Sequence, residues 1–164
     1  MPTCHACVAG LSVSIIGTAA AADILSQTSY AANRAQVYVL VNAHTAKLRR
    51  ESSAYAALLA DAERCVTLPD GASVTYAARL LGYGDIGRCP GPDLMEAICT
   101  RAAVEKLPVF LLGGSEGVAH ALADALRSRH AGLIVAGTAT PPFGEWPEEE
   151  SHRLVEAVKD SGAR

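Results

Sequence analysis

Residues 108–129, PVFLLGGSEGVAHALADALRSR, decide the fold class because an apolar run passes through glycines into a helical pattern. The run 108–112 is rich in residues that favour a buried strand. The pattern over 116–129 predicts a helix that ends at Gly132. Strand, tight turn and helix in this order are typical of one unit of an α/β protein.

The same alternation occurs along the rest of the chain. It predicts a Rossmann-like three-layer sandwich with a mostly parallel sheet flanked by helices, built as a single domain over 1–164. The first ten residues are expected to form a flexible N-terminus. The other predicted strands are 11–16, 36–41, 65–68 and 133–136, and the other predicted helices are 19–32, 52–63, 73–81, 93–107 and 148–159.

Composition and charge exclude several classes of function. The 164 residues carry a formal net charge of -3, and this mildly acidic balance gives no reason to propose nucleic acid as a partner. No apolar run approaches the roughly 20 residues that cross a bilayer, and 8–25 reads as a first strand and helix, not as a signal peptide. Five cysteines, an odd number, indicate free thiols in a reducing compartment. We therefore predict a cytoplasmic protein.

The turn Gly113-Gly114-Ser115 is a candidate anion site. Glycines let backbone N–H groups approach a ligand, and a helix N-terminus supplies partial positive charge. Ser115 can also cap the helix. The turn matches neither a dinucleotide fingerprint nor a P-loop, so a plain strand-to-helix turn is the alternative that the residues favour.

Asp70 is the sharper candidate for chemistry. It follows a predicted strand, and open α/β sheets bind ligands beyond the carboxyl ends of their strands. A carboxylate there can act as a general base toward an acceptor hydroxyl. A simple Asp-Gly turn, with Asp70 bonded to its own backbone, explains the pattern equally well.

Asn42 ends the strand 36–41 at the same expected edge of the sheet. It can orient a sugar or a catalytic carboxylate, or it can cap the strand end. The serines lack the G-x-S-x-G elbow of hydrolases. Cys4-His5-Ala6-Cys7 has no second ligand pair, so a frayed N-terminus explains it better than a zinc site. We predict no metal site.

Five segments occur in an order that resembles the WecB/TagA/CpsF family of bacterial glycosyltransferases. Each segment alone is modest, but together they cover nearly the whole chain. They are Val39-Leu-Val-Asn42-Ala43, Leu68-Pro-Asp70-Gly71 with Ala77-Ala-Arg79, Gly91-Pro-Asp93-Leu94-Met95, Val109-Phe-Leu-Leu-Gly113-Gly114 with Gly117-Val118, and Ile134-Val-Ala-Gly137-Thr138 with Pro142-Phe143.

The resemblance implies an inverting, metal-independent transferase. Such an enzyme moves an N-acetylmannosamine-type sugar from a UDP-sugar donor to a polyprenyl-diphosphate-linked acceptor, in teichoic-acid or other cell-surface polysaccharide synthesis. By motif position Asp70 is the general base and Asn42 lies beside it. The substrate-binding positions that the motifs and the glycine turn imply are Gly71, Gly91, Asp93, Gly113, Gly114, Ser115, Gly137 and Thr138. No cofactor is expected, and the enzyme would work at the inner face of the cell membrane.

The sequence also departs from the family pattern. Leu40 stands where a Thr is common, which removes a hydroxyl from the site, and His44 stands where an acidic residue is often seen. A strand with Gly-x-Pro-Lys-Gln-Glu and a basic C-terminal appendage are expected after residue 164 in this family. Without them we expect a truncated domain with an exposed sheet edge, which favours homo-oligomers.

Two other readings stay open beside the transferase. One is a non-catalytic remnant that binds a nucleotide or a protein partner through the surface that the missing part would cover. The other is a small nucleotide-binding oxidoreductase, which the absence of dinucleotide glycines at Ile16-Gly17-Thr18-Ala19 disfavours.

Overall fold

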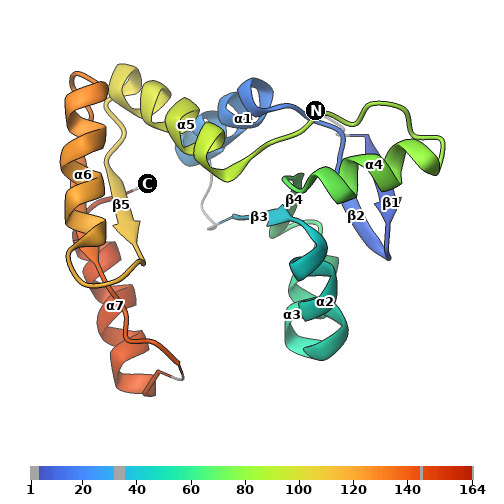
Figure 1. Cartoon of the computed structure of the whole chain (residues 1–164). Helices are drawn as coiled ribbons and strands as arrows, with labels where there is room; N and C mark the ends of the chain where they lie inside the picture. The colour runs from blue at the N-terminus through green and yellow to red at the C-terminus, as the bar shows by residue number, and fades with distance from the viewer. Residues whose placement is uncertain (1–3, 32–35, 145, 164) are drawn as a thin grey trace. The chain divides into compact units, whose positions relative to one another are not determined.

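The computed structural model describes residues 4–31, 36–144 and 146–163. Over these residues the chain is a mixed α/β protein with short parallel strand pairs flanked by helices, as the alternating pattern predicted for a Rossmann-like fold (Figure 1). The elements in chain order are β1 (His5–Val8), β2 (Leu11–Ser14), α1 (Thr18–Ala31), β3 (Val37–Val41), α2 (Ala43–Glu51), α3 (Ser53–Ala60), β4 (Cys65–Pro69), α4 (Ala72–Leu80), α5 (Gly91–Glu105), β5 (Val109–Leu112), α6 (Val118–Arg129), β6 (Val135–Ala139) and α7 (Glu148–Asp160).

The chain divides into two compact units, residues 1–97 and 98–164, and the single domain predicted over 1–164 stays a prediction. The boundary between them falls inside α5. Each one contains its own pair of parallel strands: β3 with β4 in the first unit and β5 with β6 in the second.

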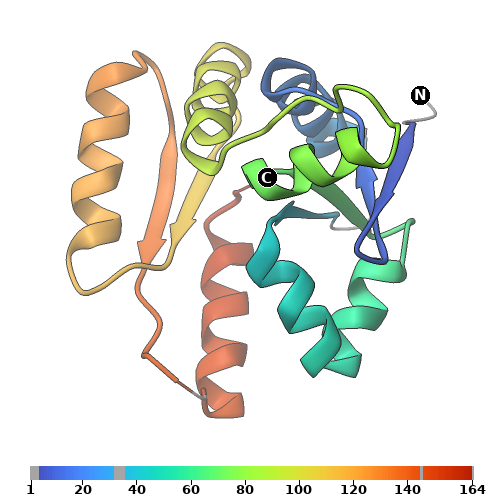
Figure 2. The ribbon, with the colours of Figure 1, turned by 45° about the vertical axis from the view of Figure 1, so that its right-hand side comes forward.

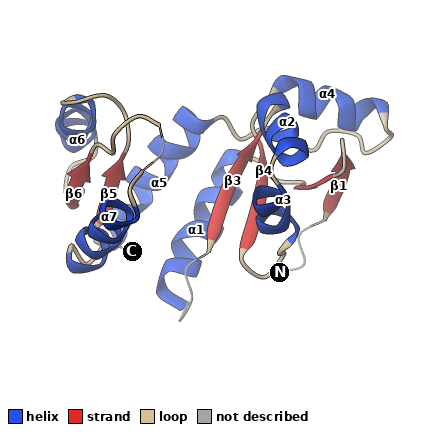
Figure 3. Cartoon of the chain, turned by 90° about the horizontal axis from the view of Figure 1, so that it is seen from below, coloured by secondary structure: helices blue, strands red, loops and turns tan. Residues whose placement is uncertain are grey.

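The parallel pair β3–β4 is the centre of the first unit. Val37 lies opposite Cys65 and Val41 opposite Pro69, so the two strands end level with each other. Their sequences, VYVLV and CVTLP, are rich in residues that suit a pleated and buried backbone. Figure 3 shows β3 and β4 side by side and pointing the same way. The Thr67 hydroxyl donates to the carbonyl of Ser12 and ties β4 to β2.

The start of the chain is a β-hairpin, so the prediction of a flexible, frayed segment over 1–10 is wrong for residues 5–10. β1 and β2 pair antiparallel with Val8 opposite Leu11, which leaves a two-residue turn. Both turn residues have positive φ, 50° at Ala9 and 76° at Gly10, as a type I′ hairpin turn requires. Residues 1–3 lie outside the described part of the chain. Ala9 is not a usual residue for this turn, so no hairpin signal could be read from residues 5–14.

A helix was predicted over 52–63, and the structure has α3 there, preceded by a second helix, α2, that was not predicted. Ser52 is extended, with φ -128° and ψ 115°, so it ends α2 and begins α3. Its Oγ accepts the N–H of Tyr55 at 3.2 Å, which caps α3. The apolar spacing over 55–62 predicted α3 correctly, but it gave no sign of the polar helix α2 before it.

Helix α4 ends in a Schellman motif. The N–H of Tyr83 donates to the carbonyl of Ala78, and that of Gly82 donates to the carbonyl of Arg79, both at 3.1 Å. Gly82 has φ +85°, the left-handed conformation that this ending requires. Val74 and Ala78 face the core, and α4 lies beside β1 (Figure 1).

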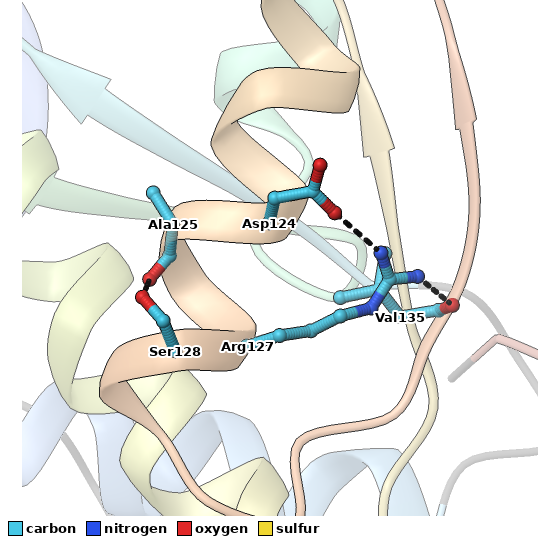
Figure 4. Close-up of polar contacts among 5 residues, drawn as sticks. All are labelled: Asp124, Ala125, Arg127, Ser128 and Val135. Atoms are coloured by element: carbon cyan, nitrogen blue, oxygen red, sulfur yellow. Dashed lines mark hydrogen bonds and ion pairs between the residues drawn. The ribbon is translucent and has the colours of Figure 1, made fainter.

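In the second unit α6 packs along the β5–β6 pair (Figure 2). Arg127 of α6 links the helix to the sheet: its Nη1 donates to Asp124 Oδ1 and its Nη2 donates to the carbonyl of Val135, both at 3.2 Å (Figure 4). Strand β6 was predicted over 133–136 and spans Val135–Ala139; Leu133, which precedes it, is buried in the core.

Each unit has its own apolar core. The buried residues of the first are Ala6, Val8, Leu11, Val13, Val41, Leu59, Cys65, Val74, Ala78 and Ile86. Those of the second are Cys99, Ala102, Ala103, Leu107, Leu126 and Leu133. Alanine is frequent in both sets, and its small side chain lets helices approach the strands closely.

In the described residues, no helix combines the length and the apolar character needed to cross a bilayer.

Candidate functional site

The carboxyl edge of β3–β4 brings together two residues that are distant in sequence. Because Val41 lies opposite Pro69, the next residues, Asn42 and Asp70, leave the sheet at the same edge. This is where parallel sheets hold their ligands. The two side chains meet: Asn42 Nδ2 donates to Asp70 Oδ2 at 3.4 Å.

Asn42 also begins helix α2. Its Oδ1 accepts the N–H groups of His44 and Thr45, at 2.9 and 3.1 Å, and the Thr45 hydroxyl completes a capping box with the Asn42 N–H. Asn42 thus caps a helix rather than the end of a strand, and a role in orienting a sugar or a catalytic carboxylate stays a prediction. The cap uses the amide oxygen, and so the amide nitrogen faces Asp70.

Backbone hydrogen bonds also hold Asp70 in place. The N–H groups of Asp70 and Gly71 both donate to the carbonyl of Val41 at 3.1 Å. A Cβ at Gly71 would lie 2.9 Å from the Cβ of Asn42, so only glycine lets the start of α4 approach this closely. The half-buried Asp70 carboxylate therefore lies in a fixed place at the N-terminus of a helix.

The loop that follows α4 returns to the same edge. Arg88 Nε donates to the carbonyl of Asp70 at 2.7 Å, and the N–H of Cys89 donates to the carbonyl of Pro69 at 2.6 Å. Arg88 is exposed and brings positive charge to the site. Arg88 belongs to no motif and was not predicted as a site residue; the available signal was that it is the only basic residue between Gly82 and Pro92.

Cys89 is a fully buried thiol beneath this edge. Burial is the main reason that its pKa lies above the ordinary value. A hydrogen bond with the Thr18 side chain lowers that pKa, whereas the negative charges of Asp70 and Asp93 raise it further. The thiol therefore stays neutral, as a packing residue and not as a nucleophile.

Gly91 and Asp93 lie in the first turn of α5. A Cβ at Gly91 would lie 3.1 Å from Leu40 Cδ1, so Gly91 lets α5 begin against the end of β3. Asp93 is exposed, and a carboxylate in the first turn is favoured by the helix dipole. The first unit thus gathers four of the predicted site residues, Asn42, Asp70, Gly71 and Gly91, at one edge, with Asp93 near Cys89.

The second unit holds the predicted glycine turn. Gly113, Gly114 and Gly117 have positive φ, and α6 begins only after Gly117. Ser115 does not cap α6, because the N-cap is Gly117 and it makes no side-chain capping bond. The N–H of Gly113 donates to the carbonyl of Ala139 at 2.9 Å and so serves the sheet. Anion binding by this turn, Ser115 included, stays a prediction.

Gly137 and Thr138 are inside β6, opposite Phe110 and Leu111. A Cβ at Gly137 would lie 2.5 Å from Phe110 Cε2, so this glycine makes room for the ring. The structure therefore gives Gly137 a packing reason. Substrate binding by Gly137 and Thr138 remains a prediction from the motif.

Among the described residues, no three side chains of the metal-binding types His, Cys, Asp and Glu gather as a metal site would need.

The segments that build both units also match a protein-family model. The model of the Glycosyl transferase WecG/TagA/CpsF family matches residues 6–164, nearly the whole chain. The match includes the strands and turns that carry Asn42, Asp70, Gly113 and Gly137. The chain therefore belongs to the WecG/TagA/CpsF family of glycosyltransferases.

Proposed function

We propose that this chain transfers an N-acetylmannosamine-type sugar from a UDP-sugar donor to a polyprenyl-diphosphate-linked acceptor at the inner face of the cell membrane. The family supports a glycosyltransferase, and the ordered motifs favour this donor and acceptor. One observation supports the catalytic assignment. The Asp70 carboxylate is half-buried at the carboxyl edge of β3–β4, with one oxygen bonded to Asn42.

In the proposed reaction Asp70 is the general base. As the acceptor oxygen attacks the anomeric carbon of the donor sugar, its O–H bond breaks and the proton passes to Asp70 Oδ1. The bond from that carbon to the diphosphate oxygen breaks at the same time, and UDP leaves with the electron pair. A single displacement from the opposite face inverts the anomeric centre.

Asn42 and Arg88 have supporting roles in this proposal. Asn42 holds Oδ2 of Asp70, so that Oδ1 is presented to the acceptor. Its 3.4 Å contact is longer than the usual range of about 2.7–3.2 Å, as is common before substrate tightens a site. Arg88 Nε donates to the backbone carbonyl of Asp70 and so helps to hold the proposed base in place.

A transfer assay with UDP-N-acetylmannosamine and a short-chain lipid-diphosphate acceptor tests the assignment. Asp70→Asn keeps the size of the side chain but removes the base, so we expect a loss of about a hundredfold to ten-thousandfold. Asp160→Asn, in the last turn of α7, is the matched control and should transfer at the wild-type rate. Equal rates for wild type and Asp70→Asn would refute Asp70 as the base.

Donor binding is measured separately by thermal shift. UDP at about a hundred times its dissociation constant should stabilise the folded chain by roughly 2.7 kcal/mol, with ADP and GDP as controls. A shift with UDP but no transfer would favour the non-catalytic reading, in which the chain only binds a nucleotide. A wild-type chain without either a shift or transfer would overturn the proposal.

A further inference from the structure

The connection between α4 and α5 contains a short segment with a fixed position. We call Asp85, Ile86, Gly87, Arg88 and Cys89 the 85–89 loop. They form no helix or strand, yet the side chains of Ile86 and Cys89 are 1% and 0% exposed. The N–H of Gly87 donates to Asp85 Oδ1 at 3.0 Å within the loop. Connecting segments normally run over the surface and move more than the elements that they join, so two buried anchors in five residues indicate an ordered loop.

One side of the 85–89 loop is bonded to the turn between β2 and α1. The N–H of Ile16 donates to the carbonyl of Ile86 at 3.0 Å. The hydroxyl of Thr18, the first residue of α1, donates to the carbonyl of Arg88 at 3.3 Å. Gly87 has φ +75°, and a Cβ there would lie 2.9 Å from the carbonyl oxygen of Ile16. Only glycine therefore lets the loop lie directly against this turn.

The other side of the loop is bonded to the end of β4. The N–H of Cys89 donates to the carbonyl of Pro69 at 2.6 Å, and Arg88 Nε donates to the carbonyl of Asp70 at 2.7 Å. These two carbonyls belong to the two peptide groups that flank the Cα of Asp70. The N–H groups of the same two peptides donate to the carbonyl of Val41. Strand β3 and the 85–89 loop thus hold both peptides from opposite sides, which fixes the direction in which the Asp70 side chain leaves the backbone.

We propose that the 85–89 loop positions the candidate base, and that Gly87 and Thr18 are positioning residues because they fix the loop on the β2–α1 turn. Neither residue acts on substrate; both act through the bonds that Arg88 and Cys89 make to the end of β4. A displacement of about 1 Å at a reacting group can cost on the order of a hundredfold in rate. The effect on transfer rests on the proposed function, whereas the hold of the loop on the two turns does not.

Gly87→Ala tests the proposal, with Gly84→Ala as its matched control. Gly84 has φ +71°, close to that of Gly87, so alanine strains the backbone in the same way at both positions. Only at Gly87 does the added Cβ meet another turn, because nothing lies within 4 Å of a Cβ at Gly84. Both variants should melt at a lower temperature than the wild type.

Transfer should separate the two glycine variants at a temperature where both are folded. The kcat of Gly87→Ala should fall by roughly tenfold to a hundredfold, because its base is misdirected. Its KM for the UDP-sugar should stay close to the wild-type value, since the change affects the base and not donor binding. Gly84→Ala should keep the wild-type kcat. Equal kcat values for the two folded variants would overturn the proposal.

Thr18 gives a second test with a conservative rescue. Thr18→Val keeps the shape of the side chain and removes the hydroxyl that holds the Arg88 carbonyl, so kcat should fall by about fivefold. Thr18→Ser keeps a hydroxyl and should restore most of the loss. A wild-type kcat in Thr18→Val, or an equal loss in Thr18→Ser, would overturn the role of Thr18.

Amide hydrogen exchange measured by NMR reads the position of the loop without any transfer. The Cys89 N–H, which donates to Pro69, should exchange at least about tenfold faster in Gly87→Ala than in Gly84→Ala. Equal exchange in the two variants would overturn the hold of the loop on the end of β4.

Failure of this inference is distinguishable from failure of the proposed function. A wild type that transfers, with an inactive Asp70→Asn and a fully active Gly87→Ala, would overturn only the positioning role. A wild type that does not transfer would overturn the proposed function, while faster exchange of the Cys89 N–H in Gly87→Ala would still support the hold of the loop on the end of β4.

Discussion

Asn42 connects a helix cap to a carboxylate: its Oδ1 accepts the first N–H groups of α2, and its Nδ2 donates to Asp70 Oδ2 at 3.4 Å. A single side chain therefore fixes where α2 begins and how the proposed base is oriented. Because the cap and the carboxylate use opposite ends of the amide, substitutions can separate the two roles.

Asn42→Asp should keep the fold and lose the reaction. Aspartate is as good an N-cap as asparagine, so the start of α2 should be kept and the loss of stability should stay below that of a variant without the cap. The new carboxylate lies against Asp70 and cannot donate to it, so transfer should fall at least tenfold. Asn42→Ala is the companion variant and should cost about 1 kcal/mol of stability through the lost cap. Wild-type transfer by Asn42→Asp would show that the amide nitrogen has no role.

The five cysteines should react with a thiol reagent at two different rates, according to whether each is buried or exposed. Cys4 and Cys7 are exposed, whereas Cys65, Cys89 and Cys99 are buried. Titration of the native chain with a thiol reagent under reducing-agent-free conditions should therefore modify two thiols quickly. All five should react in guanidinium chloride. Fast reaction of more than two in the native chain would contradict the buried positions.

Alkaline pH should destabilise the folded chain through two of these thiols. Burial raises the pKa of Cys65 and of Cys89 above the ordinary value of 9.0. A raised pKa stabilises the fold fully below the unfolded value and less as pH rises beyond it. The free energy of unfolding should thus be level near pH 7 and fall above about pH 9, and Cys65→Ala with Cys89→Ala should flatten the fall. An identical slope in that double variant would exclude the thiols as the cause.

Gly137→Ala should destabilise the second unit by steric conflict. The new methyl group would lie 2.5 Å from the Phe110 ring, and overpacking of this kind costs about 1–3 kcal/mol. Gly17→Ala is the control, because nothing lies within 4 Å of the added Cβ. Phe110→Leu should cost less in the Gly137→Ala background than in the wild type, a coupling that a double-mutant cycle measures by thermal unfolding. Additive losses would show that the ring and the methyl group do not meet.

Ala9→Asn should stabilise the N-terminal hairpin. Ala9 has φ 50°, a left-handed conformation that costs an ordinary residue about 1–2 kcal/mol and that asparagine adopts more readily. A gain of about 1 kcal/mol is expected in thermal unfolding. Ala9→Val should have the opposite effect, since a β-branched residue resists positive φ. A stabilising valine would mean that the turn has another conformation.

The alternating pattern of the sequence predicted most of the fold. Strands β3, β4 and β5 and helices α4 to α7 occur within a few residues of their predicted positions, because each carries its own periodicity or its own glycine and proline signals. The two elements that were not predicted, β1 and α2, lack such signals. β1 pairs through a turn with Ala9 in an unusual conformation, and α2 is a polar helix that depends on the Asn42 cap.

The sequence by itself determined the α/β class, the family motifs and the choice of Asp70 and Asn42 as candidates, since short-range patterns and residue chemistry carry that information. Only the tertiary structure decided that these two side chains touch, that Arg88 bonds the backbone carbonyl of Asp70, and that Tyr76 and Leu80 of α4 stay in solvent. Those facts depend on strand register and on how the loop after α4 returns to the sheet. Contacts between residues distant in sequence are set by packing, which no local pattern of residues records.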